Sequence, residues 1–319
     1  LIMKILITGA AGNLGSNLAR HLLDSSHELK LLIHNKELPQ DITVSPNVSI
    51  YRANLDVLET LVEPCKGTDC IVHFAGVLFA PYPEKFLPKT NIEYVRNLLD
   101  EALAAKVGKF ILVSFPHVEG ETFPEKPATG RLDIIPASIH AHTRLKVEKI
   151  LLASCGGTSM APVILRAGMI YGKGILMIEA ARWLLRHRLL AVWKQQTWVH
   201  ILSLPDFISC VVSAIEQDNI SGIYNLGDDQ PLTLQEFLDT IADYWGYHKP
   251  WRFPRWSFYM AACCCEAFAT VFRTKSPLTR DFIKIGMASY VSDTTRMKDN
   301  LLPKLTYPSL KDGLHLLDA

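Results

Sequence analysis

Three glycines recur at a fixed spacing near the start of the chain, at Gly9, Gly12 and Gly15. Glycine in such positions permits a tight turn and lets the backbone come close to a phosphate, because no side chain intervenes. We therefore predict that these glycines, with Asn13 and Leu14 between the last two, hold the pyrophosphate of a dinucleotide.

The residues around the glycines predict the elements that such a loop requires. Residues 4–7 are an apolar run typical of a buried strand, and leucines at 14, 18 and 22 follow at helical spacing. The N-terminus of this helix would offer unpaired N–H groups and the positive end of its dipole to the phosphates. An ordinary tight turn between a strand and a helix is the alternative, and the context favours phosphate binding.

A second candidate position lies at the end of the next predicted strand, residues 28–34. His34 is nineteen residues after Gly15 (34 − 15), where an NAD-binding protein often has an acid for the ribose 2′-hydroxyl. The position here is basic, with His34 and Lys36, and this favours the 2′-phosphate of NADP over NAD. NAD remains the second candidate cofactor, and a solvated loop without a ligand is the alternative.

Apolar runs alternate with helical patterns over much of the chain. This alternation predicts an α/β fold, a doubly wound parallel sheet of the Rossmann type with about six or seven strands. The region 120–136 is rich in Pro, Glu, Thr and Gly and is typical of an active-site loop. The remaining strands are expected at 48–56, 70–76, 110–114 and 162–166, with helices at 92–105, opened by Asn91, and at 140–153.

Several motifs resemble those of the short-chain dehydrogenase/reductase superfamily, in the same order along the chain. The glycines are spaced Gly-x-x-Gly-x-x-Gly with Thr8 in front, as in that superfamily. From Lys4 to about Gly246 the matches are similar to an extended member, of the NAD-dependent epimerase/dehydratase type. The further matching segments are Ile71-Val72-His73-Phe74-Ala75-Gly76, Arg166-Ala167-Gly168-Met169-Ile170-Tyr171-Gly172, Trp198-Val199-His200-Ile201 and Ile223-Tyr224-Asn225-Leu226-Gly227.

The resemblance implies a division of the chain and further cofactor contacts. It implies a dinucleotide-binding domain at 1–166, rejoined by about 198–220. A second, smaller and mostly helical substrate lobe would consist of 167–197 and 221–319. It also implies that Asn54 and Leu55 touch the adenine and that Phe74, Ala75 and Gly76 lie along the cofactor.

Family members that transfer a hydride use a Ser or Thr after the fifth strand and a Tyr and a Lys four residues apart on the next helix. Aligned on Leu145 and Glu148, this chain has His140 in the place of the Tyr and Arg144 in the place of the Lys. A second register pairs His142 with Lys146. Neither register has a Tyr, so the usual catalytic set is replaced.

The place of the catalytic hydroxyl holds Phe115, with Ser114 as its neighbour. Arg144 keeps its proton but can still donate to ribose hydroxyls. His140 could act as an acid or base, although the charge of Arg144 would hold it mostly neutral. His117 and Glu119 are expected to face the same cleft. We predict His140, Arg144, Ser114 and His117 as the catalytic set and Arg144 also as a cofactor contact, with a structural role as the alternative for each histidine.

The composition of the chain limits the kinds of ligand and partner that the protein is expected to bind. The net charge of +1 gives no reason to expect nucleic-acid binding. Seven cysteines without zinc-ligand spacing indicate free thiols, a reducing cytoplasm and no metal site. The predicted strand begins at residue 4, so we expect no signal peptide. Residues 256–272 are nearly all apolar and predict a helix over the substrate cleft, with a helix on a membrane surface as the alternative.

Three functions fit these observations. The first is a cofactor-dependent oxidoreductase or epimerase acting on a hydroxyl- or carbonyl-bearing small molecule, for which the apolar segment 256–272 favours a hydrophobic substrate. The second is a non-catalytic dinucleotide-binding sensor or subunit, suggested by the replaced catalytic residues. The third is a non-redox isomerase or cyclase in the same pocket. The sequence leaves a homodimer open.

Overall fold

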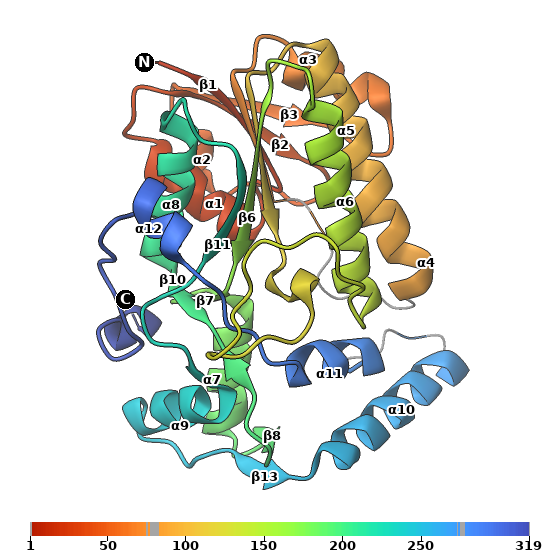
Figure 1. The fold of residues 1–319 in the computed structure, drawn as a ribbon, viewed down its shortest axis with the longest axis vertical. Coiled ribbons are helices and arrows are strands. Elements are labelled where there is room, and N and C mark those ends of the chain that lie inside the picture. Colours follow the sequence, from red (N-terminus) through yellow and green to blue (C-terminus); the bar gives the residue numbers. More distant parts are fainter. Residues whose placement is uncertain (1, 75, 77–82, 273, 275–277, 319) are drawn as a thin grey trace.

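The computed structural model describes residues 2–74, 76, 83–272, 274 and 278–318. A seven-stranded parallel sheet forms the centre of one half of the molecule (Figure 1). Its strand order is β11-β6-β5-β4-β1-β2-β3, so the order reverses between β1 and β4, where ligands bind in such sheets. The strands are β1 Lys4–Thr8, β2 Glu28–Ile33, β3 Val48–Arg52, β4 Cys70–His73, β5 Lys109–Ser114, β6 Ala161–Ala167 and β11 Gly222–Leu226.

Helices cover both faces of this sheet, which confirms the predicted doubly wound fold. Successive side chains of a strand point to opposite faces. Ile5 and Ile7 therefore pack beneath α1, α8 and α12, whereas Leu6 packs beneath α3, α5 and α6. The helices of the two layers are α1 Asn13–Leu22, α8 Leu204–Glu216 and α12 Thr295–Asn300, and α3 Val62–Cys65, α5 Tyr94–Ala104 and α6 Ile139–Cys155; α2 Gln40–Thr43 follows β2.

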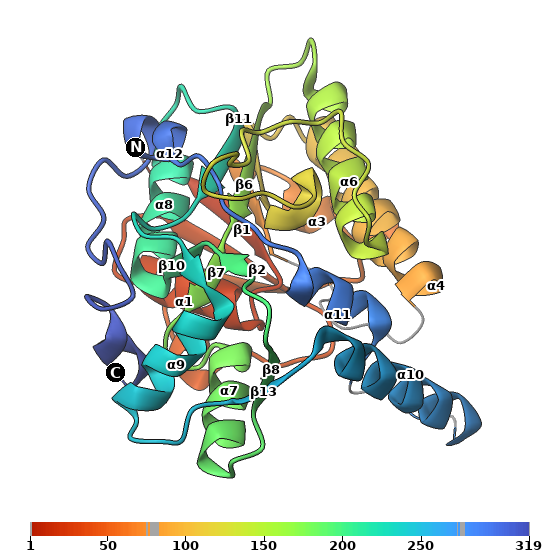
Figure 2. The same cartoon turned by 60° about the horizontal axis from the view of Figure 1, so that its bottom comes forward.

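A smaller, mostly helical lobe occupies the other half of the molecule (Figures 1 and 2). Its own apolar core includes Ile178, Leu185, Phe237 and Ile241, contributed by α7 and α9. Three two-stranded pairs, β7–β10, β9–β12 and β8–β13, complete it. The bounds are β7 Met169–Tyr171, α7 Leu176–Arg186, β8 Ala191–Trp193, β9 Trp198–Val199, β10 Ile201–Ser203, β12 Leu232–Thr233, α9 Leu234–Tyr244, β13 Trp251–Phe253, α10 Arg255–Phe272 and α11 Arg280–Met287.

Some boundaries differ from the predicted ones. β11 was expected in the substrate lobe, but it pairs with β6 at the edge of the main sheet, because its apolar residues continue the core beneath α8 and α12. Asn91 does not open a helix: α4 Pro83–Leu87 and a π-helical segment Pro88–Glu93 precede α5. The division of the chain into two functional domains otherwise stays a prediction.

The apolar segment 256–272 is helix α10, which extends away from the body of the lobe (Figure 2). Only Ala262 and Ala269 of this helix are buried. It packs on α11, and part of its surface faces solvent. Among the residues that the structure describes, no helix is long and apolar enough to cross a membrane.

Candidate functional site

The glycine loop joins β1 to α1 and forms a tight turn. Gly9 has a φ of 70°, a left-handed conformation that favours glycine, and its carbonyl accepts the Gly12 N–H at 2.8 Å. A Cβ on Gly15 would overlap the Gly9 carbonyl and lie 2.9 Å from Ala10 Cα. Gly15 therefore lets the helix lie directly on the loop.

The N-terminus of α1 is shaped to receive an anion. Gly12 occupies the N-cap position, and no described side chain caps the helix there. No acidic residue lies in the first turn, so the positive end of the helix dipole is not offset locally. The Asn13 side chain donates to the Gly174 carbonyl, which links the loop to the smaller lobe.

The end of β2 carries the residues predicted to read the adenosine ribose. His34 and Lys36 are both exposed there. Arg52 at the end of β3 also belongs to this region, although no sequence motif indicated it: it donates to the His34 carbonyl at 3.5 Å and pairs with Glu37. Its position opposite Ile33 across two parallel strands could have indicated this.

Asn54 and Leu55 lie in the turn that follows β3, and both are partly buried. The Asn54 backbone N–H donates to the Thr60 hydroxyl at 3.0 Å, and the Asn54 side chain accepts from the Asp56 N–H at 3.0 Å. The Leu55 carbonyl accepts from Asn97 at 2.9 Å. These bonds tie the turn to residues 56, 60 and 97, and its contact with an adenine stays a prediction.

At the end of β4, Phe74 and Gly76 are described and Ala75 lies outside the described residues. Phe74 packs edge-on against Phe207 of α8, with ring centroids 6.3 Å apart. Arg144 reaches Gly76 from α6, so closely that a Cβ on Gly76 would overlap its guanidinium. This places one predicted cofactor residue directly against another.

Arg144 is buried without a carboxylate partner among the described residues, and its Nε has no hydrogen-bond partner. Burial lowers the pKa of Arg144 to about 10, although the nearby Glu148 opposes this shift. A buried guanidinium without a partner is costly. Ribose hydroxyls or a phosphate beside it would satisfy the free donor, so this residue fits a dinucleotide.

His140 lies one helical turn before Arg144 and is 3% exposed. Burial, and then the charges of Arg144 and His117, lower the pKa of His140 to about 3. The expectation that His140 is neutral is confirmed, with burial as the larger cause. His142 and Lys146 of the second register are exposed, so only the first register places both side chains inside the protein.

Phe115 separates His140 from His117 at the end of β5. Its ring lies 4.8 Å from that of His140 and 5.0 Å from that of His117, measured between centroids. The Nε2 of His117 lies 3.1 Å from the Ala288 carbonyl, and its Nδ1 has no partner among the described residues. Burial lowers the pKa of His117 to about 4.

Ser114 and Glu119 are engaged elsewhere, in a buried charge network. The Ser114 hydroxyl donates to Glu148, and Arg166 pairs with Glu148 at 2.6 Å and with Glu119 at 2.5 Å. Glu119 also accepts the N–H groups of residues 129 and 130 at 3.1 and 2.6 Å. The expectation that Glu119 faces the cleft as an acid or base is therefore wrong: it neutralises Arg166 and anchors the loop.

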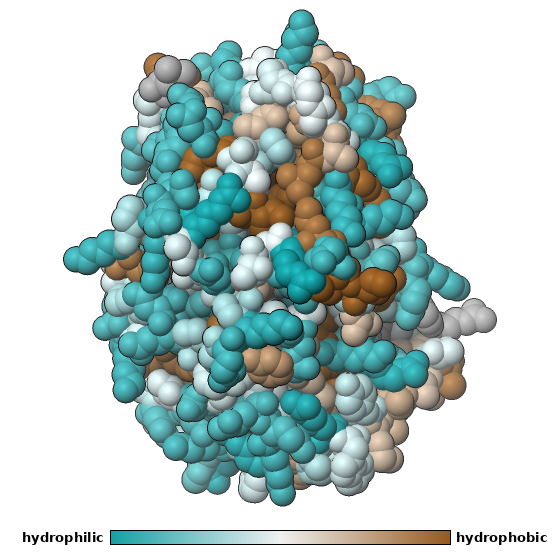
Figure 3. Space-filling model, in the orientation of Figure 1, coloured by the Kyte–Doolittle hydropathy of each residue, from teal (hydrophilic) through white to brown (hydrophobic). Residues whose placement is uncertain are grey.

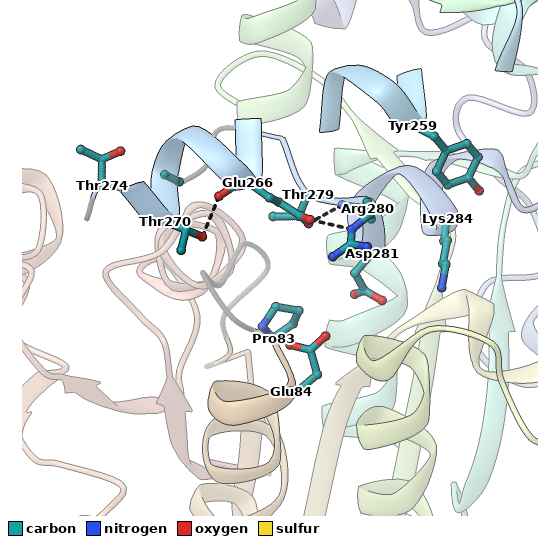
Figure 4. Close-up of a pocket in the computed structure, with 11 residues that line it drawn as sticks. Pro83, Glu84, Tyr259, Glu266, Thr270, Thr274, Thr279, Arg280, Asp281 and Lys284 are labelled. Carbon is teal, nitrogen blue, oxygen red and sulfur yellow. Dashed lines mark hydrogen bonds and ion pairs between the residues drawn. The ribbon is translucent and has the colours of Figure 1, made fainter. Parts of the chain in front are cut away.

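A pocket of about 440 Å³ lies between the start of α4 and helices α10 and α11 (Figure 4). The α10 residues Tyr259 and Glu266 line it, so the inner edge of this helix does border a pocket. Glu266 pairs with Arg280 at 2.6 Å, and Asp281 of α11 accepts the Ile139 N–H at 3.3 Å. The second bond places α11 against the N-terminus of the helix that carries His140.

The described residues hold no cluster of His, Cys, Asp and Glu that could bind a metal ion.

The glycine loop, Gly76 and Phe115 all follow parallel strands and meet at one edge of the sheet, as in dinucleotide-binding Rossmann proteins. The model of the NAD dependent epimerase/dehydratase family matches residues 5–227. The chain belongs to this family and is an extended short-chain dehydrogenase/reductase.

Known relatives are distant in sequence. The chain is 24% identical to a 2-alkyl-3-oxoalkanoate reductase of Stenotrophomonas maltophilia, over 99% of both chains. It is 23% identical to a 3-beta-hydroxysteroid dehydrogenase of Mycolicibacterium neoaurum, over 54% of this chain and about half (48%) of that protein. A UDP-glucuronic acid 4-epimerase of Bacillus cereus, solved with UDP-glucuronic acid and NAD, has a TM-score of 0.77 at 21% identity, over 99% and 98% of the chains. This last similarity is one of fold.

Proposed function

We propose that this protein is a dinucleotide-dependent enzyme of the oxidoreductase/epimerase class that acts on a hydrophobic small molecule bearing a hydroxyl or carbonyl group. The observation that carries the proposal is the pair His140 and Arg144, buried one turn apart on α6, with Arg144 against Gly76. In this arrangement Arg144 would contact the cofactor and His140 would contact the substrate.

The proposed cofactor is NADP(H), held by the glycine loop, Asn54, Leu55, Phe74, Gly76 and Arg144, with His34 and Lys36 at the 2′-phosphate. NAD(H) is the second candidate, because Glu37 lies close to Arg52 at the same strand end and its charge would oppose a phosphate. Calorimetric titration of the wild type and of Lys36→Ala with both dinucleotides tests this. A preference for NADP(H) that Lys36→Ala abolishes supports the proposal, and equal affinities contradict it.

The bound dinucleotide would accept or supply a hydride. A neutral His140 has a ring nitrogen that can accept the proton of a substrate hydroxyl as the alcohol is oxidised. With a pKa of about 3 it is a weak base, and little of it is protonated at neutral pH to act as the acid in the reverse step. Arg144 would orient the ribose and keep its proton. Phe115, which packs against the rings of His140 and His117, would exclude water from the reacting group.

The names of two relatives support a hydrophobic substrate. One reduces a 2-alkyl-3-oxoalkanoate and the other is a 3-beta-hydroxysteroid dehydrogenase, both acting on largely apolar molecules with a carbonyl or hydroxyl. Tyr259 and Ala269 contribute apolar atoms to the pocket beside α10, whose other lining residues are mostly charged residues and threonines.

A second candidate is a dinucleotide-binding sensor without catalysis. It is favoured by a specific arrangement: Phe115 stands between the two histidines, and Ser114 donates to Glu148. The hydroxyl proton of Ser114 is thus engaged with Glu148 rather than available to a substrate.

Turnover and binding measured together separate the two functions. The wild type and His140→Gln would be tested for hydride transfer to NADP⁺ and NAD⁺ from secondary alcohols of increasing chain length, and for binding by calorimetry. We expect binding to persist in His140→Gln while turnover falls ~10²–10⁴-fold, as for a lost acid/base group. Dinucleotide binding without turnover in the wild type would favour the sensor. Turnover that His140→Gln leaves unchanged would show that His140 has no catalytic role.

A further inference from the structure

Helix α10 carries an exposed apolar stripe that the proposed reaction does not use. Trp256, Met260 and Phe268 recur at intervals that place them on one face of the helix, and they are 63%, 58% and 58% exposed. Val271, 75% exposed, extends the face, and Cys264 lies within it. The one acid of the helix, Glu266, points to the opposite side, where Arg280 pairs with it.

The stripe continues onto neighbouring parts of the lobe. Trp251 and Phe253 of β13 are exposed, as is Leu189 in the turn after α7. The indole N–H of Trp251 donates to the Arg188 carbonyl at 3.0 Å, which fixes β13 beside that turn. Figures 1 and 2 both show α7, β8, β13 and α10 at the same end of the molecule. In Figure 3, the region of α10 is coloured white to tan rather than teal.

The charges of this surface that have no ion-pair partner among the described residues are all basic. Residues 180–194 and 245–265 contain arginines and lysines and no Asp or Glu. Arg186, Arg188 and Lys194 are exposed and have no ion pair with any described residue. The other basic side chains in these two ranges are Arg182, Lys249 and Arg252, each paired with an acid, and Arg255, which donates to Thr197.

Exposed tryptophans and phenylalanines next to unpaired cations are the composition of a surface that lies in a membrane interface. Aromatic rings are stable at the level of the lipid headgroups, and the cations are attracted to anionic lipids. A face for a second protein copy would instead need acids opposite these cations. A helix that is not long and apolar enough to span a bilayer can still lie along its surface.

We propose that the outer face of α10, with β13 and the turn after α7, docks the protein on the surface of a membrane that carries anionic lipids. We call this surface the docking face; it consists of residues 186–189, 194, 251–253 and the outer stripe of α10. The interaction is independent of the reaction that the protein catalyses.

Vesicle flotation of the full chain tests the proposal. We expect binding to vesicles of phosphatidylcholine with phosphatidylglycerol, weaker binding to phosphatidylcholine alone, and a loss of binding as salt rises, because screening weakens attraction between surface charges. Trp256→Ser/Phe268→Ser should lower the vesicle affinity by roughly tenfold or more, since it removes two interfacial aromatic rings. Arg186→Gln/Arg188→Gln should reduce binding to the anionic vesicles only.

The matched control is Val44→Ser/Val62→Ser, which removes two exposed apolar side chains from the sheet half of the molecule. It should bind vesicles like the wild type. Equal binding by the wild type and both docking-face variants, or no binding by the wild type, would overturn the proposal. A concentration-dependent dimer that the Trp256→Ser/Phe268→Ser variant abolishes, in a protein that ignores vesicles, would assign the face to a second copy instead.

The exposed thiols provide a second measurement. Cys65, Cys70, Cys155 and Cys210 are buried, whereas Cys264 is exposed in the stripe. In a Cys263→Ser/Cys265→Ser background, an environment-sensitive fluorophore on Cys264 should shift its emission to the blue when anionic vesicles are added. An unchanged spectrum under conditions where the protein floats with vesicles would show that another surface makes the contact.

Discussion

His140 is a buried and His117 a partly buried neutral side chain, and this makes the folded protein sensitive to acid. Their pKa values lie near 4 and 3, against about 6.5 in an unfolded chain. Between these values the unfolded chain binds more protons than the folded protein does. The stability from keeping both rings neutral is therefore fully present above pH ~6.5 and decreases as the pH falls.

The double variant His117→Gln/His140→Gln should remove this acid sensitivity. Relative to the variant, the wild type should lose about 2 kcal/mol of unfolding free energy per histidine between pH 7 and 5. Urea unfolding at pH 5, 6 and 7 measures the difference. Asp228, whose pKa burial raises to about 8, shifts stability in the opposite direction but is present in both proteins. The exposed His248→Gln is the control, and parallel pH profiles for wild type and double variant would contradict the prediction.

Gly76 and Arg144 should depend on each other in binding the dinucleotide. Arg144→Ala should weaken binding by about 1.5–3 kcal/mol, the range for a hydrogen bond to a charged group. Gly76→Ala should fold normally, because the overlapping atoms belong to the mobile end of a side chain, but it should displace the guanidinium and weaken binding. The two losses should not add in the double variant. Calorimetry gives all three affinities, and fully additive losses would show that Arg144 does not act at this place.

At the scale of elements, the glycine loop determines how closely α1 approaches β1. Gly15→Ala would place a methyl group against the backbone of Gly9 and Ala10, which cannot rotate away. We expect a loss of about 1–3 kcal/mol in stability, as for overpacking, and weaker dinucleotide binding because the N-terminus of the helix moves. Gly108→Ala, whose methyl group would meet the Asp69 carbonyl at 3.4 Å, is the control in thermal unfolding. Equal stability of the two variants would mean that the loop adapts without cost.

The elements around this loop could be predicted from sequence because their signals are local. Each local pattern predicts one element: the apolar run at residues 4–7 predicts β1, the glycine spacing predicts the loop, and the leucines that follow predict α1. The alternation of such strands and helices along the chain predicts the parallel sheet. The helix with His140 and Arg144 was expected at 140–153 and spans Ile139–Cys155. Its first turn is capped by Ser138, whose hydroxyl accepts the Ala141 N–H at 3.1 Å.

The charge network of Arg166 could not be predicted, because it joins residues far apart in sequence. Glu119, Glu148 and Arg166 belong to a loop, a helix and a strand that meet only after folding. One signal was available: Arg166 is the one charged residue in β6, and a charge in a central strand needs a buried partner. Ser114 faces Arg166 across β5 and β6, so a partner of Arg166 could have been expected near the end of β5.

At the scale of the whole molecule, the C-terminal segment holds the two halves together. Residues 297–305 pack against the core of the sheet, and Leu310 and Leu317 pack into the core of the lobe. Between them the chain passes Asp206 at the start of α8. The order of elements along the chain does not predict this attachment, because it depends on one carboxylate that accepts hydrogen bonds from two backbone N–H groups.

Asp206 should therefore control the attachment of this segment. It is fully buried, accepts the N–H groups of Thr306 and Tyr307 at 2.8 and 2.9 Å, and accepts the Ser203 hydroxyl at 2.8 Å. Asp206→Ala leaves these donors without an acceptor, so we expect a loss of at least about 3 kcal/mol in stability. Hydrogen exchange should accelerate at residues 306 and 307, whereas dinucleotide binding by the glycine loop persists, because Asp206 makes no hydrogen bond to the described residues of that loop. Asp312→Ala, which removes a single contact with Ser309 in the same segment, is the control. Unchanged exchange at 306 and 307 in Asp206→Ala would show that apolar packing alone anchors the segment.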